Sequence, residues 1–233
     1  MSQICLIPIW LDWSGRTVLV IGLGQVGQRR ALLFQRAGAT VVGVDPIPQN
    51  KGPDWGELIR NGLELRSEPY DESVFDELTQ FKMRPDLVLT CASAEVNARV
   101  VRDSKSRSHW VVSGTNSSDE PANAHLGAVA SGEIVQVAIR SGNVAPALSV
   151  ALRDQIVENL LPAADRIAAE AARLRPELLG RVEDPDKRRE LLALFGSSEL
   201  LSLESGNPGA GVAQIRKRIR DSLDQSNDLD RKL

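Results

Sequence analysis

The chain has 233 residues, of which 42% are hydrophobic and 25% are charged, and this is enough for one sizeable core or for a main domain with a smaller one. Its net charge of −3 and its pI of about 5.6 exclude a protein that binds nucleic acid or an anionic membrane through overall charge. The two cysteines, Cys5 and Cys91, stand far apart, which excludes a disulfide framework and a Cys-x-x-Cys metal site and favours a reducing cytoplasm.

The first elements of the chain predict a strand, a helix and a second strand. The N-terminal stretch MSQICLIPIWLDW has no basic region, and no part of the chain approaches 18 apolar residues, so neither a signal peptide nor a membrane span is expected. Residues 16–21, RTVLVI, have the short β-branched pattern of a buried parallel strand. Helical spacing follows over 25–37, Gly38 is placed to end that helix, and 40–45 predict the second strand.

The same alternation continues as far as residue 114. In chain order we expect a weak helix around 53–61, a strand at 63–69, a helix at 71–81, a strand at 86–92, a helix at 94–107 and a strand at 110–114. Strands that alternate with helices in this way predict an α/β fold with a Rossmann-type, doubly wound parallel sheet.

After Gly114 the pattern changes. The stretch NSSDEPANAHLG predicts a loop, and EIVQVAIRSG at 133–142 alternates apolar and polar residues as a half-exposed strand does, with Val135, Val137 and Ile139 on one side. From Ala147 onward the pattern is helical, and the expected helices are 147–160, 162–174, 185–195 and 210–224, with a loop at 205–211. The basic run at 216–220 predicts a solvated helix face.

The run GLGQVG predicts a dinucleotide site. It matches G-x-G-x-x-G, it follows a strand and opens a helix, and an acid, Asp45, stands roughly 20 residues further on. Gly22 allows the tight turn, Gly24 lets the backbone approach a pyrophosphate, and Gly27 lets helix and strand pack closely. The start of the helix offers N–H groups and the positive end of its dipole to phosphate.

Asp45 indicates which dinucleotide is bound. A carboxylate at the end of the second strand accepts hydrogen bonds from ribose hydroxyls and repels a 2′-phosphate, so NAD is favoured over NADP. The structural alternative is that the glycines are turn residues and Asp45 caps a strand. Arg29 and Arg30, on the first turns of the helix, fit either a solvated face or a place near an anionic ligand.

Four segments stand in a characteristic order between residues 5 and 162. They are IPIWLDWSGRTVLVIGLGQVGQRRALLFQRAGATV, DLVLTCASAEVNARVV, NSSDEP and VQVAIRSGNVAPALSVALRDQIVENLLP. Together they resemble the precorrin-2 dehydrogenase family, which forms the N-terminal module of siroheme synthases. The chain departs from that family at several positions: GLGQVG replaces Gly-Gly-Gly-x-x-Ala, Cys91 and Ala92 replace part of a Thr-Asp-Asp, and Ala145 stands where Ser is common.

The resemblance implies an NAD-dependent oxidation of precorrin-2 to sirohydrochlorin in siroheme biosynthesis, and in some members also Fe²⁺ insertion by a ferrochelatase activity. Asp119, in the matching Asn-x-x-Asp-x-Pro motif, is then the catalytic base. On the residues alone, a structural role for Asp119 in a polar turn is favoured over a catalytic one. The implied NAD-binding residues are Gly22, Gly24, Gln25, Val26, Gly27, Asp45, Cys91, Ala92 and Asn97.

The implied substrate is a polycarboxylate, so its pocket needs cations and hydrogen-bond donors. The candidates are Arg29, Asn116, His125, Arg140, Ser141 and Asn143. No resident metal site is expected, because no spaced cluster of His, Cys and carboxylate residues occurs, and His109 is expected to be a strand-edge residue.

The resemblance also implies a cytoplasmic homodimer. The chain then divides into an NAD-binding domain at 1–115, a dimerisation element at 116–150, whose strand pairs across a two-fold axis, and a helical domain at 151–233. The active site forms between the nucleotide domain of one subunit and the helical part of the other. The methyltransferase domain of longer members is not expected here.

Two other functions remain open from the sequence. A non-catalytic NAD-binding regulatory module needs the glycine turn and Asp45 but neither Asp119 nor the helical tail. A generic small-molecule dehydrogenase lacks its Tyr-x-x-x-Lys pair, because Tyr70 is the only tyrosine.

Overall fold

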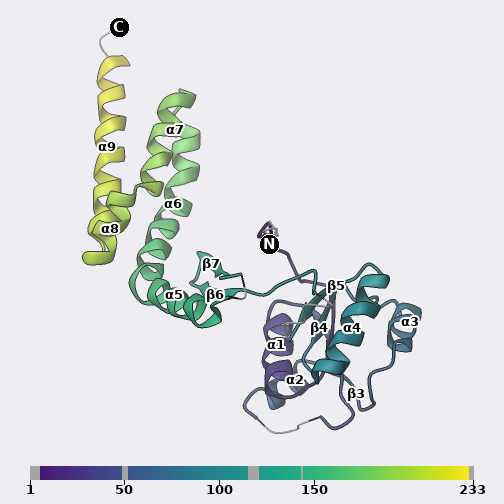
Figure 1. Ribbon diagram of the computed structural model, residues 1–233. Coiled ribbons are helices and arrows are strands. Elements are labelled where there is room, and N and C mark those ends of the chain that lie inside the picture. The colour runs from purple at the N-terminus through teal and green to yellow at the C-terminus, as the bar shows by residue number, and fades with distance from the viewer. Residues whose placement is uncertain (1–5, 49–51, 115–120, 143, 231–233) are drawn as a thin grey trace. The chain divides into compact units, whose positions relative to one another are not determined.

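The computed structural model describes residues 6–48, 52–114, 121–142 and 144–230, with side chains as far as residue 224. The chain forms two compact units, Met1–Leu126 and Gly127–Leu233 (Figure 1). Within the described residues, no helix combines the length and the apolar character needed to cross a membrane.

The first unit is built on a five-stranded sheet in the order β3-β2-β1-β4-β5, and every neighbouring pair is parallel. The strands are β1 (Thr17–Ile21), β2 (Thr40–Val44), β3 (Glu64–Arg66), β4 (Leu87–Thr90) and β5 (Trp110–Ser113). Strand β1 lies in the middle, where Val18 faces Val41 on one side and Leu87 on the other. The predicted Rossmann-type sheet is confirmed.

Helices cover both faces of this sheet (Figure 1). They are α1 (Gln25–Arg36), α2 (Trp55–Arg60), α3 (Ser73–Gln80) and α4 (Ala94–Ser106). Side chains alternate along β1, so Val18 and Val20 pack with α1 and α2, whereas Leu19 and Ile21 pack with α3 and α4. A strand buried on both faces must be apolar throughout, which explains the unbroken run that made β1 recognisable in the sequence.

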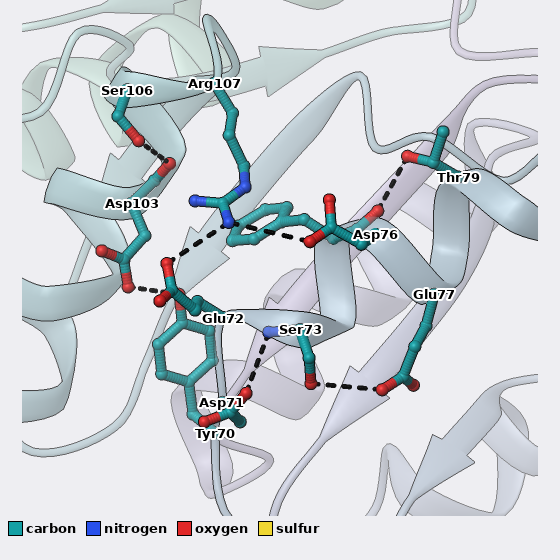
Figure 2. A network of polar contacts seen from close by, with 11 residues as sticks. Tyr70, Asp71, Glu72, Ser73, Asp76, Glu77, Thr79, Asp103, Ser106 and Arg107 are labelled. Atoms are coloured by element: carbon teal, nitrogen blue, oxygen red, sulfur yellow. Dashed lines mark hydrogen bonds and ion pairs between the residues drawn. The ribbon is translucent and has the colours of Figure 1, made fainter.

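A polar network joins α3 to α4 on one face of the sheet (Figure 2). The Tyr70 hydroxyl donates to the Asp103 carboxylate at 2.8 Å, and burial and this bond raise the pKa of the phenol. The Arg107 guanidinium lies 3.3 Å from the Glu72 carboxylate and stacks over the Phe75 ring. Tyr70 therefore fastens the segment before α3 to α4.

The second unit begins with a β-hairpin. Strands β6 (Ala128–Ser131) and β7 (Gln136–Ile139) pair antiparallel, whereas the sequence predicted one strand at 133–142 and did not predict β6. The predicted alternation is confirmed: Val135, Val137 and Ile139 are half-buried, and the residues between them are exposed. The prediction missed β6 because its short AVAS sequence carries no polar and apolar alternation.

One carboxylate fastens this hairpin to the helix α6 (Leu161–Arg181). The Asp165 carboxylate accepts the backbone N–H groups of three consecutive turn residues, at 2.8, 3.1 and 2.8 Å for Glu133, Ile134 and Val135. The bond from Val135 contributes most to the lowered pKa of Asp165. A Cβ at Gly132 would overlap this carboxylate, so the turn needs a glycine there.

The rest of the unit is helical, with a short 3₁₀ turn at Leu194–Gly196. The other helices are α5 (Pro146–Asn159), α7 (Pro185–Ala193), α8 (Ser198–Gly206) and α9 (Ala210–Asp230). Helix α6 continues through Pro176, seven residues beyond its predicted end, because Leu178 and Val182 pack into the core of the unit. Helix α8 was not predicted.

Buried carboxylates bind the long helices together. Glu170 of α6 is 5% exposed, and both of its oxygens accept hydrogen bonds from Arg216 of α9, at 2.9 and 2.7 Å. Glu204 of α8 is fully buried and accepts the N–H groups of Gly209 and Val212 at the start of α9. The solvated face predicted for residues 216–220 is confirmed at Arg216, whose side chain is 51% exposed, and is wrong at Ile219, which is 5% exposed.

We predict that the Glu170 pair makes the stability of the second unit depend on pH. Hydrogen bonds from Arg216 and then from Arg173 lower the pKa of Glu170 from 4.5 to about 2. Its stabilising contribution is therefore present above pH 4.5 and is lost as the pH falls toward 2. Glu170→Gln should reduce the free energy of unfolding at pH 7 by about 2 kcal/mol in urea titrations.

The matched control is Glu199→Gln, because Glu199 pairs with Arg218 but is 73% exposed. This variant should change the free energy of unfolding by less than about 0.5 kcal/mol. The difference between wild type and Glu170→Gln should narrow below pH 4.5, and a difference that stays constant down to pH 3 would contradict the assignment.

Candidate dinucleotide site

The turn from β1 to α1 crosses the turn from β4 to α4 at very close range. Gly22 has a φ of +93°, and a Cβ there would lie 2.6 Å from the Cys91 carbonyl oxygen and 2.7 Å from the Ala92 nitrogen. Only glycine satisfies both the left-handed backbone and this contact. Gly22 is therefore required for two reasons: the tight turn that the sequence predicted, and the close approach of the neighbouring backbone.

Gly24 stands at the start of α1 with an ordinary extended backbone, φ −66° and ψ −176°. Within the described residues, nothing lies within 4 Å of the place where its Cβ would stand. Gln25 and Val26, the first residues of the helix, are exposed. The amide groups of a first helical turn have no partner inside the helix, so this surface is suited to a phosphate.

Gly27 packs the first turn of α1 onto the glycine turn itself. A Cβ at this position would lie 1.9 Å from the Gly22 carbonyl oxygen and 3.4 Å from the Cys91 Cβ. An alanine, which is common at this position in the precorrin-2 dehydrogenase family, would not fit this conformation. This explains why the glycine motif of this chain ends in a glycine at position 27.

Asp45 follows the last residue of β2 and turns its carboxylate toward the glycine turn. One carboxylate oxygen accepts the Leu23 N–H at 2.6 Å, and the other accepts the Ile47 N–H at 2.8 Å. The acid and the glycine turn therefore meet, as the sequence predicted from their spacing. This donor set fits a dinucleotide: glycine backbone and helix start for the diphosphate, and a carboxylate for the ribose hydroxyls.

The turn after β4 forms the other wall of the site. Asn97 is 1% exposed. Its side-chain oxygen accepts the Ala92 N–H at 3.0 Å, and its side-chain nitrogen donates to the Ala92 carbonyl at 3.1 Å. Asn97 thus shapes the turn that carries Cys91 and Ala92. Burial raises the pKa of the Cys91 thiol, which keeps it neutral.

The predicted substrate residues are only partly described. Asn116, Asp119 and Asn143 lie outside the described residues. His125 and Arg140 are exposed, and so is Arg29 on α1. The Ser141 hydroxyl donates to the Ala145 carbonyl at 2.7 Å, and Ala145 begins α5 without a side-chain cap.

Asn123 is a residue that the sequence analysis did not single out. Its side-chain amide accepts the Val111 N–H at 2.7 Å and donates to the His109 carbonyl at 3.1 Å. The backbone N–H of Ala124 adds a bond to the Val111 carbonyl. These bonds hold the segment before His125 against the edge strand β5. The only sequence signal for them is an Asn in a polar loop.

A hollow of about 360 Å³ lies at the opposite edge of the sheet, among the residues that precede β1, β4 and β5. It is lined by Trp13, Arg84 and His109, among others. His109 is buried and stacks on Phe75, as a structural residue does. Ligands of open α/β sheets bind at the carboxyl ends of the strands, so we place the site at the glycine turn. Within the described part of the chain, no group of three potential metal ligands gathers.

Comparison with known proteins gives the same fold and a more specific resemblance. The family NAD_binding_7, described as "Putative NAD(P)-binding", matches residues 9–128. The chain is 28% identical to the siroheme synthase of Thiobacillus denitrificans, in a match that covers 93% of this chain and 43% of that protein. It is 31% identical to the siroheme synthase of Methylobacillus flagellatus, in a match that covers 78% of this chain and 37% of that protein. It therefore spans less than half of these relatives.

A solved structure adds a likeness in fold. The precorrin-2 dehydrogenase SirC superposes with a TM-score of 0.66 at 20% identity, over 91% of this chain and 100% of that one. The likeness covers both the sheet and the helical part, so the fold expected from the sequence is confirmed.

Two glycine substitutions should separate folding from nucleotide binding. Gly24→Ala places a methyl group where the described structure is open, so the free energy of unfolding should change by less than about 1 kcal/mol. The same methyl group blocks the approach of the diphosphate, so calorimetry should show NAD binding at least ~10-fold weaker.

Gly22→Ala should do the opposite, because its Cβ meets the Cys91 and Ala92 backbone in the fold itself. We expect it to lower the free energy of unfolding by about 2–3 kcal/mol in urea titrations. Unchanged NAD affinity in Gly24→Ala would show that the diphosphate does not cross this turn.

Proposed function

Since the chain belongs to the NAD(P)-binding family NAD_binding_7, we propose that it is an NAD-dependent dehydrogenase that oxidises precorrin-2 to sirohydrochlorin in siroheme biosynthesis. The observation that carries the proposal is the nucleotide cradle, in which Gly22 is pressed against Cys91 while Asp45 closes on the glycine turn. The siroheme synthase relatives and the precorrin-2 dehydrogenase fold support the choice of substrate.

In this proposal, each part of the nucleotide site binds a different part of NAD. The backbone of Gly24, Gln25 and Val26 binds the diphosphate, and Asp45 accepts hydrogen bonds from the adenine ribose and repels a 2′-phosphate. The turn at Cys91 and Ala92, held by Asn97 from beneath, borders the nicotinamide half. When bound, NAD supplies the two-electron oxidant.

Asp119 completes the reaction in this proposal. Oxidation of the macrocycle removes a hydride, which NAD accepts, and a proton, which a carboxylate within hydrogen-bond reach accepts. The carboxylates of the substrate are bound by His125, Arg140 and Ser141, together with Asn116 and Asn143. Fe²⁺, where it is inserted, is a second substrate, and Asp119 then accepts the pyrrole protons.

We further propose that the enzyme works in the cytoplasm as a homodimer through the hairpin and α5. Exposed apolar side chains, each with 41–53% of its surface exposed, lie on the hairpin and on two faces of α5: Val129 and Ile134 on the hairpin, Leu148 and Leu152 on one face of the helix, and Val150 and Val157 on the other. Exposed apolar surface of this extent is typical of a protein interface. A second copy of the chain covers it.

The activity is tested with enzymatically prepared precorrin-2 under anaerobic conditions. Wild type should form NADH and sirohydrochlorin in equal amounts, and Asp119→Asn should lower kcat by at least ~100-fold with NAD binding unchanged. Adding Fe²⁺ to the same assay measures metal insertion. Tight NAD binding without turnover would instead identify a non-catalytic regulatory module, and full turnover in Asp119→Asn would remove Asp119 from the mechanism.

The dimer is tested by light scattering after gel filtration. Leu152→Arg puts a charge into the apolar surface of α5 and should convert the dimer to a monomer at micromolar concentration. Leu203→Arg on α8 is the matched control, because Leu203 is 41% exposed where Leu152 is 44% exposed. A Leu152→Arg variant that stays dimeric places the interface elsewhere.

A further inference from the structure

Arg30 differs from the other half-buried arginines of the first unit. Among the described residues of this unit, three arginines are half-buried: Arg30, Arg66 and Arg107. Arg66 pairs with the Glu77 carboxylate at 2.5 Å, and Arg107 lies 3.3 Å from that of Glu72. Within the described residues, the only partner of Arg30 is a sulfur, since its Nη1 donates to the Cys91 Sγ at 3.5 Å.

The thiol leaves the charge of Arg30 uncompensated. Burial raises the pKa of Cys91, so its sulfur is a neutral and weak acceptor. A guanidinium carries five donors in a planar fork that matches a carboxylate, and a half-buried guanidinium without an anion is costly. The site therefore contains a preformed position for an anionic group.

The position of Arg30 narrows the choice of anion. The strand order reverses between β1 and β4, and ligands of open α/β sheets bind in the crevice at such a point. Arg30 reaches from α1 to the end of β4 and so bridges the two sides of this crevice. The diphosphate of the dinucleotide is served by the free N–H groups at the start of α1, whereas Arg30 belongs to the second turn of this helix.

The neighbouring residue supplies a contrast. Arg29 is exposed, and in the described structure no ion pair or hydrogen bond of its side chain is found. Arg29 is one of the predicted substrate-binding residues, because a polycarboxylate substrate needs cations. Successive residues of a helix are rotated by about 100°, and of these two arginines only Arg30 donates a hydrogen bond to Cys91.

We propose that Arg30, rather than Arg29, binds a carboxylate of the tetrapyrrole and thereby sets the specificity of the site for a polycarboxylate substrate. This inference rests on the proposed precorrin-2 dehydrogenase function. It adds one defined contact: a bidentate guanidinium–carboxylate pair that replaces the hydrogen bond to Cys91 when substrate is bound.

The test compares Arg30→Gln, Arg30→Lys and Arg29→Gln in the full chain. Arg30→Gln removes the charge and keeps a hydrogen-bonding side chain, so KM for precorrin-2 should rise at least ~10-fold while kcat changes less than about threefold. Arg30→Lys keeps the charge and should recover part of this loss. Arg29→Gln should alter KM less than about twofold.

Two binding measurements accompany the kinetics. Quenching of tryptophan fluorescence by sirohydrochlorin should weaken in Arg30→Gln as KM rises, and calorimetry should give the same Kd for NAD in all variants. Wild-type affinity for the tetrapyrrole in Arg30→Gln overturns the inference, and so does a weaker NAD Kd with an unchanged KM for precorrin-2. A wild-type chain that does not oxidise precorrin-2 overturns the proposed function itself, and that outcome is visible before any variant is measured.

Discussion

The site depends on the contact between two turns that cross at the carboxyl edge of the sheet. Gly22 lies so close to the backbone of Cys91 and Ala92 that no side chain fits, and Gly27 lies even closer to the carbonyl of Gly22. These contacts fix where α1 begins, and the start of α1 fixes where a phosphate can bind. The hydrogen bond from Leu23 to Asp45 then ties the acid at the end of β2 to the same turn. The candidate nucleotide site is thus a consequence of backbone packing around two glycines, Gly22 and Gly27, while Gly24 leaves the surface between them open.

The nucleotide half was predictable from sequence for a physical reason. Parallel strands buried on both faces are apolar throughout, as in β1 and β2, and glycines are required where backbones meet. Both signals are local, so the sheet, its helices and the meeting of Asp45 with the glycine turn followed from the residues. The family resemblance supplied the chemistry, which neither periodicity nor composition contains.

Features that depend on distant partners were not predictable. Helix α8 carries Glu204, whose carboxylate accepts hydrogen bonds from the start of α9, and Arg216 pairs with Glu170, 46 residues away in the sequence. Asn123 completes the edge of β5 through side-chain bonds that no motif records. Arg29 and Arg30 are alike in sequence and differ only in the direction that the helix gives them. Asp119, Asn116 and Asn143 remain predictions.

The central claim is that this crossing forms a site for NAD, with Asp45 selecting against a 2′-phosphate. Calorimetric titration of the wild-type chain with NAD and then with NADP, in the same buffer, tests it most directly. The account predicts that NAD binds at least ~10-fold more tightly than NADP, because a carboxylate at the ribose repels the added phosphate. Equal affinities, or tighter binding of NADP, would contradict it.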